Sequence, residues 1–277
     1  MAITAQDVNK LRQMTGAGMM DCKKALTEAN GDFDAAIDLL RKKGQKVSAA
    51  RAENATSEGM ILTHISADGT NAKLVAFACE TEPVSKVENF RELGQAIMDA
   101  AVKHNPADTD ALLALNLADG RSIQENIIDL TGKIGEKLVI QAYENITAEK
   151  MVSYIHSNGK LGVLVALKNV NGASVEDAGK DVAMQIAAMN PVALDKDGVD
   201  ATIIQREIEV GKEQARAEGK PEEMLEKIAQ GKLNKFFKDN TLLEQAFVKD
   251  NSVSIAKYLD SVSKGLTVSA FKRVAIG

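Results

Sequence analysis

A run of glycines and lysines near the N-terminus, residues 15–26 (TGAGMMDCKKAL), suggests chemistry because such runs can cradle phosphate. A phosphate-binding loop needs four residues between its glycines and a serine or threonine directly after its lysine, at the start of a helix that follows a strand. Here a single residue separates the glycines, and the preceding residues predict a helix, with Thr4 as N-cap and apolar side chains at three-residue steps. The run therefore predicts a tight turn between two helices, not a phosphate-binding loop.

Two adjacent methionines, Met19 and Met20, open the second of these helices, which the sequence predicts over residues 19–29. Neighbouring helical residues point about a quarter-turn apart, so both side chains cannot lie fully within a small core. Two interpretations stay open. Either both methionines pack against the core, or at least one is an exposed, adaptable apolar contact for a partner protein.

The three histidines form no pattern that indicates catalysis or metal binding. His64 lies within a predicted strand and is expected to be a core or edge residue. His104 ends a predicted helix, where a cation complements the helix dipole. His156 directly precedes a predicted hairpin turn, where contact with a partner and simple solvent exposure are equally open interpretations.

The segment Thr81-Glu82-Pro83-Val84 directly follows a predicted strand that ends at Glu80. Taken alone, glutamate and proline after a strand predict a turn that begins a loop. Glu80, Glu82 and Glu88 could together bind a divalent cation, although a charged loop is the favoured interpretation. We find no catalytic constellation, and we predict a protein that is not an enzyme and that uses no cofactor or metal.

The composition is that of an ordinary globular protein, long enough at 277 residues for two modest domains. Apolar residues make up 45% and charged residues 26% of the chain. The net charge is −5 and the basic residues form no block, which argues against nucleic acid or an anionic membrane as the main partner. The absence of a signal-like N-terminus or a long apolar stretch predicts a cytoplasmic protein. Cys22 and Cys79 lie in different predicted modules and support neither a disulfide nor a zinc site.

Residues 1–44 predict a three-helix domain that resembles a ubiquitin-associated fold. The third helix begins after Asp32 as N-cap, and it is expected to end at the basic residues 41–43, with Gly44 as the C-terminal stop. Residues 45–58, rich in alanine, serine, lysine and arginine, predict a helical or extended linker.

From residue 59 the sequence contains an internal repeat, with a first copy at 59–147 and a second at 148–277. The copies share a hairpin, a helix that ends at Asn-Pro and a closing strand, at 60–80, 93–106 and 138–143 in one and 151–168, 178–191 and 266–271 in the other. Asn158-Gly159 predicts a type I′ turn in the second hairpin. We predict an α+β fold with two similar subdomains, each a three-stranded antiparallel sheet backed by helices.

The second copy is longer because residues 200–239 are inserted into it. These residues read as two charged helices with sparse apolar positions, joined at Gly219-Lys220-Pro221. A narrow apolar seam needs only one partner helix, so we predict an antiparallel helical hairpin that projects from the body.

The 15–26 run, with Arg12 before it and Gly31-Asp32 after it, resembles the N-terminal signature of the bacterial elongation factor Ts family. This resemblance implies a guanine-nucleotide exchange factor that binds and stabilises the nucleotide-free state of the translational GTPase elongation factor Tu during translation elongation. It also implies that Arg12, Met19, Met20 and His156 contact this GTPase. The family has a helical hairpin at the position of the insertion described above.

The sequence departs from the family pattern at two places. Where the family usually has Thr-Asp-Phe-Val-Ala, this chain has Thr81-Glu82-Pro83-Val84-Ser85. The resemblance implies that this segment enters the GTPase near its magnesium site and helps to dislodge the ion, but Pro83 cannot stack as phenylalanine does. The sequence ends at Gly277, whereas many family members carry a further helical module, so we expect the three-helix domain to supply more of the grip.

The alternative function is that of a ubiquitin-associated-like adaptor that holds a peptide on its helical bundle and has no exchange activity. An exchange factor needs no catalytic residues, because tighter binding of the nucleotide-free GTPase is sufficient to promote nucleotide release. Both alternatives are consistent with a chain that offers interaction surfaces rather than a reactive site.

Overall fold

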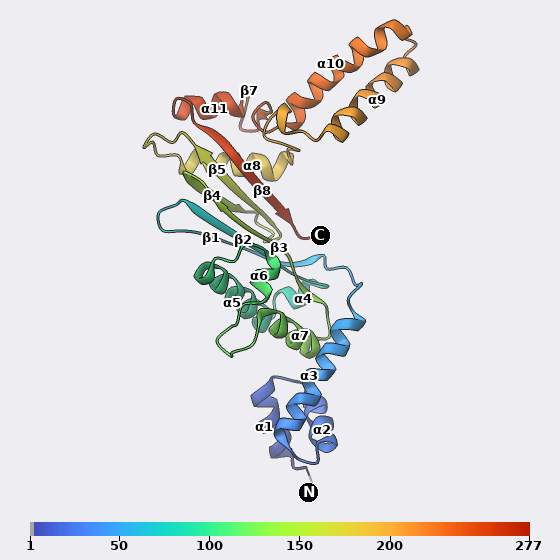
Figure 1. Cartoon of the computed structure of the whole chain (residues 1–277), viewed down its shortest axis with the longest axis vertical. Helices are drawn as coiled ribbons and strands as arrows, with labels where there is room; N and C mark the ends of the chain where they lie inside the picture. The colour runs from blue at the N-terminus through green and yellow to red at the C-terminus, as the bar shows by residue number, and fades with distance from the viewer. Residues whose placement is uncertain (1–2) are drawn as a thin grey trace.

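The computed structural model describes residues 3–277 as an elongated molecule with three parts along its long axis (Figure 1). A helical bundle at the N-terminal end is followed by a central body of two sheets with their helices, and a helical hairpin extends from the far end. The mixture of helices with small antiparallel sheets confirms the predicted α+β class. None of the helices within residues 3–277 is long and apolar enough to span a lipid bilayer.

The N-terminal bundle consists of α1 (Ala5–Thr15), α2 (Met19–Glu28) and α3 (Phe33–Ala50). The Thr4 side chain accepts a hydrogen bond from the Asp7 N–H, and the Asp7 carboxylate accepts one from the Thr4 N–H, so a complete capping box begins α1. Asp32 caps α3 through the Ala35 N–H, as predicted. The apolar faces of the three helices enclose a small core of their own.

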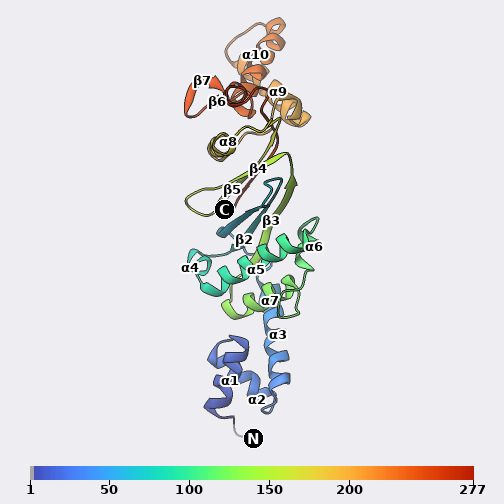
Figure 2. The ribbon, with the colours of Figure 1, turned by 90° about the vertical axis from the view of Figure 1, so that its left-hand side faces the viewer.

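The predicted end of the third helix at Gly44 is wrong, because α3 continues through Gly44 to Ala50. Gly44 serves instead as a crossing point with α7 (Ile123–Ile134): a Cβ built on Gly132 of α7 would lie 2.5 Å from the Gly44 Cα. Glycine inside a helix costs about 1 kcal/mol relative to alanine. Here it allows two backbones to approach more closely than any side chain permits, and this crossing joins the bundle to the central body (Figure 2).

The first repeat forms an antiparallel sheet in the order β1-β2-β3, covered on one face by helices. Its strands are β1 (Glu58–Ile65), β2 (Asn71–Cys79) and β3 (Leu138–Thr147), and its helices are α4 (Glu82–Ser85), α5 (Glu88–His104), α6 (Thr109–Leu113) and α7. The stacked rings of Phe77 and Phe90, with centroids 4.4 Å apart, lie in the core between sheet and helices.

The second repeat forms a sheet in the order β4-β5-β8, also antiparallel. Its strands are β4 (Lys150–Ile155), β5 (Leu161–Lys168) and β8 (Thr267–Ala275), and the helices against them are α8 (Glu176–Met189) and α11 (Ile255–Val262). A short 3-10 helix (Lys196–Gly198) and a small hairpin of β6 (Ala246–Phe247) and β7 (Asp250–Ser254) complete it. The insertion forms the predicted antiparallel pair, α9 (Ala201–Ala217) and α10 (Glu222–Asn240).

The two sheets pack against each other through their helix-free faces, where alanines allow a close approach. Two backbone hydrogen bonds join them symmetrically: the Ile61 N–H donates to the Gly159 carbonyl (2.9 Å), and the Met151 N–H donates to the Gly69 carbonyl (2.7 Å). Each residue of one bond lies 90 positions from its counterpart in the other. The internal repeat of the sequence therefore appears in space as a two-fold arrangement of two similar halves.

The predicted type I′ turn at Asn158-Gly159 is wrong, because that turn requires positive φ at both central residues and only Gly159 has it (+72°). The chain makes a longer loop, in which the His156 N–H donates to the Leu161 carbonyl and the Gly159 N–H donates to the His156 carbonyl. The Asn158 side chain accepts a hydrogen bond from the Lys160 N–H, which stabilises this loop without a left-handed asparagine. The first hairpin repeats the arrangement with Gly69 at φ +75°.

Candidate functional site

The 15–26 run forms the end of α1, a tight turn and most of α2, as predicted. Gly16 ends α1 in the left-handed conformation (φ +68°), and its N–H donates to the Arg12 carbonyl at 2.7 Å. The Thr15 hydroxyl accepts from the Ala17 N–H, and the buried Cys22 thiol points back to the Ala17 carbonyl. The small and polar residues of the run thus shape a helix-to-helix turn, which excludes a phosphate-binding loop here.

Met19 and Met20 both lie on the outer surface of the bundle, with 50% and 74% of their surface exposed. The opposite face of α2 supplies Cys22 and Leu26 to the core. The interpretation that both methionines pack in the core is therefore wrong, and the predicted exposure is confirmed. Arg12 is also exposed, on the last turn of α1. The role of these three residues in binding a partner stays a prediction.

Met14 is a third exposed methionine of the bundle, at 57%, and the sequence reasoning missed it. It continues the three-residue apolar steps of α1 from the buried Val8 and Leu11. Each such step advances about 300° around a helix, so the third member of the series drifts off the buried face. The signal that could have revealed it was present in the spacing.

The 81–84 segment belongs to a single helical turn, α4 (Glu82–Ser85), which begins directly after the central strand of the first sheet with Thr81 as its N-cap. Thr81, Glu82 and Pro83 are exposed, whereas Val84 is buried against the core. Glu136 holds the start of this turn, because its carboxylate accepts hydrogen bonds from the Thr81 N–H (3.0 Å) and hydroxyl (2.7 Å). Pro83 suits the first turn of a helix, where its missing N–H has no partner to lose. The chain turns after the strand as predicted, but it forms a helical turn that leads into α5 and not the start of a loop.

The structure places the 81–84 turn and the His156 hairpin at the same end of the paired sheets. Lys160 of the hairpin forms an ion pair with Glu58, the first residue of β1 (2.9 Å). A hydrogen bond from Lys86 and its charge hold the pKa of Glu82 below its usual value, and the charge of Lys160 contributes to the same shift. Two candidate segments that are far apart in the sequence therefore belong to one surface.

The three histidines occupy three different environments. His156 is exposed at the hairpin tip, and its Nδ1 lies 2.9 Å from the Tyr154 hydroxyl. His64 is half-buried in β1 opposite Lys73, and His104 is exposed as the last residue of α5. Within the described residues they do not gather with cysteines or carboxylates into a group that could hold a metal.

Glu80 is engaged by neighbouring donors instead of facing an open site. Its carboxylate accepts from Arg51 Nη1 (3.0 and 3.1 Å), the Asn54 amide (2.9 Å) and the Lys137 backbone N–H (2.6 Å). Burial alone raises the pKa of this carboxyl, but the three donors outweigh it and hold the pKa below its usual value. Glu80 is thus a structural anion at the base of the 81–84 turn.

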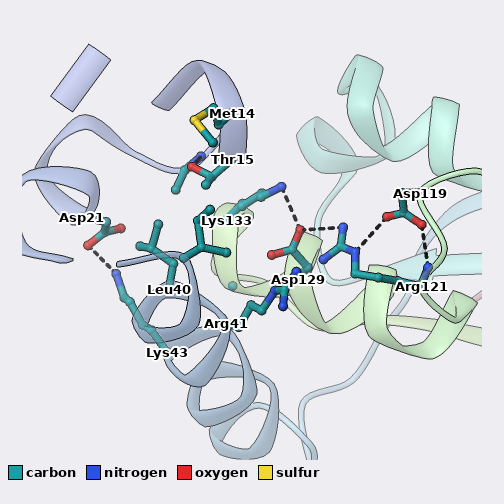
Figure 3. A pocket seen from close by; sticks show the side chains of 13 residues that line it. Met14, Thr15, Asp21, Leu40, Arg41, Lys43, Asp119, Arg121, Asp129 and Lys133 are labelled. Atoms are coloured by element: carbon teal, nitrogen blue, oxygen red, sulfur yellow. Dashed lines mark hydrogen bonds and ion pairs between the residues drawn. The ribbon is translucent and has the colours of Figure 1, made fainter. Parts of the chain in front are cut away.

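A cleft of about 320 Å³ lies between the α1–α2 turn and α7, next to the crossing of α3 with α7 (Figure 3). On its bundle wall Lys43 pairs with Asp21 (2.5 Å). On the α7 wall Asp129 pairs with Lys133 (2.8 Å) and more loosely with Arg121 (3.6 Å). All the charges of this cleft except Arg41 are paired with one another, and Arg41 contacts Asp38 outside it (3.8 Å), so we assign the cleft no ligand.

Comparisons with known proteins place the chain in a family. The family model described as elongation factor TS matches residues 80–277, which include the 81–84 turn and both sheets' closing strands. The chain is 70% identical over 274 residues to a protein named elongation factor Ts from Cytophaga hutchinsonii, with 99% of each chain covered. It is 55% identical over 277 residues to the protein of that name from Amoebophilus asiaticus, and 50% identical over 276 residues to that from Christiangramia forsetii.

The fold and these matches define a translation elongation factor. The chain belongs to the elongation factor Ts family, as the N-terminal signature indicated.

Proposed function

We propose that this protein is the guanine-nucleotide exchange factor of the translational GTPase elongation factor Tu, and that it works without a catalytic residue or a cofactor. The observation that carries the proposal is the exposure of Met19 and Met20, on a signature run whose inner face already supplies a complete core. Two large apolar side chains held in water on a small domain favour a protein partner.

The physical basis of the exchange is differential binding. A protein that binds the nucleotide-free GTPase more tightly than the loaded form lowers the affinity of that GTPase for nucleotide by the same factor. Such binding needs several contact points, and the exposed residues supply them at separate places: Arg12, Met19 and Met20 on the bundle, and His156 on the β4–β5 hairpin.

We further propose that the 81–84 turn acts near the magnesium ion of the GTPase. Glu82 presents a carboxylate there, and Pro83 presents a stiff ring with fixed φ. The buried Val84 anchors the turn by packing into the core of the first repeat. Thr81 contributes through its hydrogen bonds to Glu136, which orient the turn. The expected setting is the cytoplasm, with no direct contact to nucleic acid or membrane.

The test is to add small amounts of this protein to elongation factor Tu loaded with fluorescent GDP. An exchange factor speeds release when it is present far below the GTPase concentration. An adaptor of the ubiquitin-associated type, the alternative, binds without this acceleration. Gel filtration adds a second criterion, because a complex that persists equally at saturating GDP contradicts the reciprocity that exchange requires.

A further inference from the structure

Three segments that are distant in the sequence meet at the side chain of Glu80, which is 15% exposed. Arg51 and Asn54 belong to the chain that leaves α3, and Lys137 belongs to the connection between α7 and β3. Glu80 itself lies between the last residue of β2 and the 81–84 turn. One carboxylate therefore joins the end of the bundle's longest helix to the start of the turn.

The α7–β3 connection strengthens this junction from the other side. The Lys137 ammonium donates to the carbonyls of Ala52 (2.5 Å) and Asn54 (3.0 Å). The preceding residue, Glu136, holds Thr81 through two hydrogen bonds. Lys137 therefore bonds the chain after α3, and its neighbour Glu136 bonds the start of the turn, so the α7–β3 connection links the two.

The second repeat lacks such a junction. The residue 90 positions after Glu80 is Val170, whose N–H, like that of Asn169, donates to the Glu149 carboxylate. Glu149 lies between β3 and β4, so this contact stays local to the second sheet. The equivalent place in the same scaffold thus folds without a buried carboxylate, which indicates that Glu80 serves something beyond the sheet itself.

We propose that Glu80 is a positioning residue. It fixes the position of the 81–84 turn relative to the end of α3, and through α3 relative to Met19 and Met20 of the bundle. This proposal rests on the proposed function for its consequence, namely that the bundle and the turn engage the GTPase as one unit. The junction itself is a property of the free protein and is tested there first.

The first experiment measures amide hydrogen exchange of the full chain without a partner. Glu80→Gln removes the charge and leaves one acceptor for three donors, so we expect exchange to be about tenfold faster, both in residues 81–87 and in residues 52–57. Asp181→Asn is the matched control, because Asp181 is 19% exposed and accepts from Lys249 and Tyr258 in the second repeat. Unchanged exchange in either segment of Glu80→Gln overturns the proposal.

The second experiment measures GDP release from elongation factor Tu with magnesium and with a chelator. We expect Glu80→Gln to release GDP about tenfold more slowly in magnesium and nearly normally once the ion is removed. Asp181→Asn should match wild type under both conditions. An equal slowing with and without chelator indicates a merely structural role and overturns the positioning role.

The two experiments separate the possible failures. If wild-type protein does not accelerate release, the proposed function fails, while hydrogen exchange still decides whether Glu80 joins the two segments. Should Glu80→Gln not fold, Arg51→Gln replaces it, because this change leaves the carboxylate with two of its three donors. Both segments must then still exchange faster together.

Discussion

The two repeats connect their central strand to the following helix in different ways. In the first, the chain leaves β2 at Cys79 and passes through Glu80 into an exposed helical turn that carries Pro83. In the second, it leaves β5 at Lys168 and makes a loop in which Asn169 and Asn171 both have positive φ. The two halves therefore share their scaffold but differ in this connection, and the proposed magnesium-directed turn belongs to the first half only.

The shared scaffold extends to its irregularities. The register between central and closing strand shifts at Ala76/Phe77 in the first sheet and at Ala166/Leu167 in the second, again 90 positions apart. The main helices end at Asn105 and Asn190, both left-handed, with φ of 50° and 45°. The two halves therefore share the irregularities of their scaffold as well as the order of its elements.

The largest effect is expected where the helix of each repeat crosses its sheet at a glycine. A Cβ at position 179 would overlap the branched Val152, whereas a Cβ at position 94 would meet the flexible tip of Met60 at 2.9 Å. Gly179→Ala should therefore lower the free energy of unfolding by about 2 kcal/mol, and Gly94→Ala by less than about 1 kcal/mol. Chemical denaturation measures both, and equal losses would show that the two crossings are alike.

The next effect tests whether the connection of the first repeat carries a function that the second lacks. Glu82→Ala with Pro83→Ala removes the exposed carboxylate and the stiff ring, so we expect GDP release in magnesium to slow about tenfold and to recover when magnesium is chelated. Asn171→Ala, in the second repeat's connection, should leave release unchanged. Stopped-flow fluorescence measures the rates, and a double variant as fast as wild type in magnesium removes the turn from the mechanism.

A smaller effect is expected from the exposed methionines. Met20→Asp should weaken binding to nucleotide-free elongation factor Tu several-fold, because it places a charge on an apolar contact, and should leave the Tm within about 2 °C of wild type. Met189→Asp, on a methionine that is 46% exposed at the end of α8, is the control. Calorimetric titration and circular dichroism measure the two quantities. Equal weakening by both changes would mean that the exposed methionine of the bundle is no more important for binding than one on the second repeat, and a large fall in Tm would place Met20 in the core.

The smallest effect is expected at the Cys79 thiol, which should hardly react with an alkylating reagent in the folded protein. Burial, followed by the charges of Glu136 and Glu58, raises the pKa of the Cys79 thiol to about 12. Below that pH the Cys79 thiol of the folded protein stays in its neutral, unreactive form. In the unfolded chain the same thiol ionises near its ordinary pKa of about 8.5. Iodoacetamide at pH 9 should leave Cys79 unmodified in the native protein and modify it in denaturant, as peptide mass spectrometry can show. Rapid native modification would reveal that the β2 end opens.

Local signals predicted much of the fold correctly. Thr4 and Asp32 mark helix starts because capping depends on neighbouring residues alone, and the repeat is visible because both halves bury the same pattern of side chains. The end of α3 was mispredicted because Gly44 has a partner on another helix, Gly132, which no local rule reveals. For the same reason the donors around Glu80 and the nearness of Lys160 to Glu82 could not be foreseen, since they lie 26 to 78 positions apart.

Because α3 crosses α7 at two glycines, a small change in the crossing angle produces a larger displacement at the far end of α3. The helix extends from Gly44 back to Phe33, a distance of about 17 Å at 1.5 Å per residue. A tilt of about 5° at the crossing therefore moves the far end of α3 by about 1.5 Å, roughly one carbon–carbon bond length. Because no side chains lie between the two backbones at the crossing, small angular changes in the body displace the far end of α3 and the α2–α3 turn beside it. Met19 and Met20 lie beside the Asp21–Lys43 ion pair, close to the crossing, so the same rotation displaces them much less.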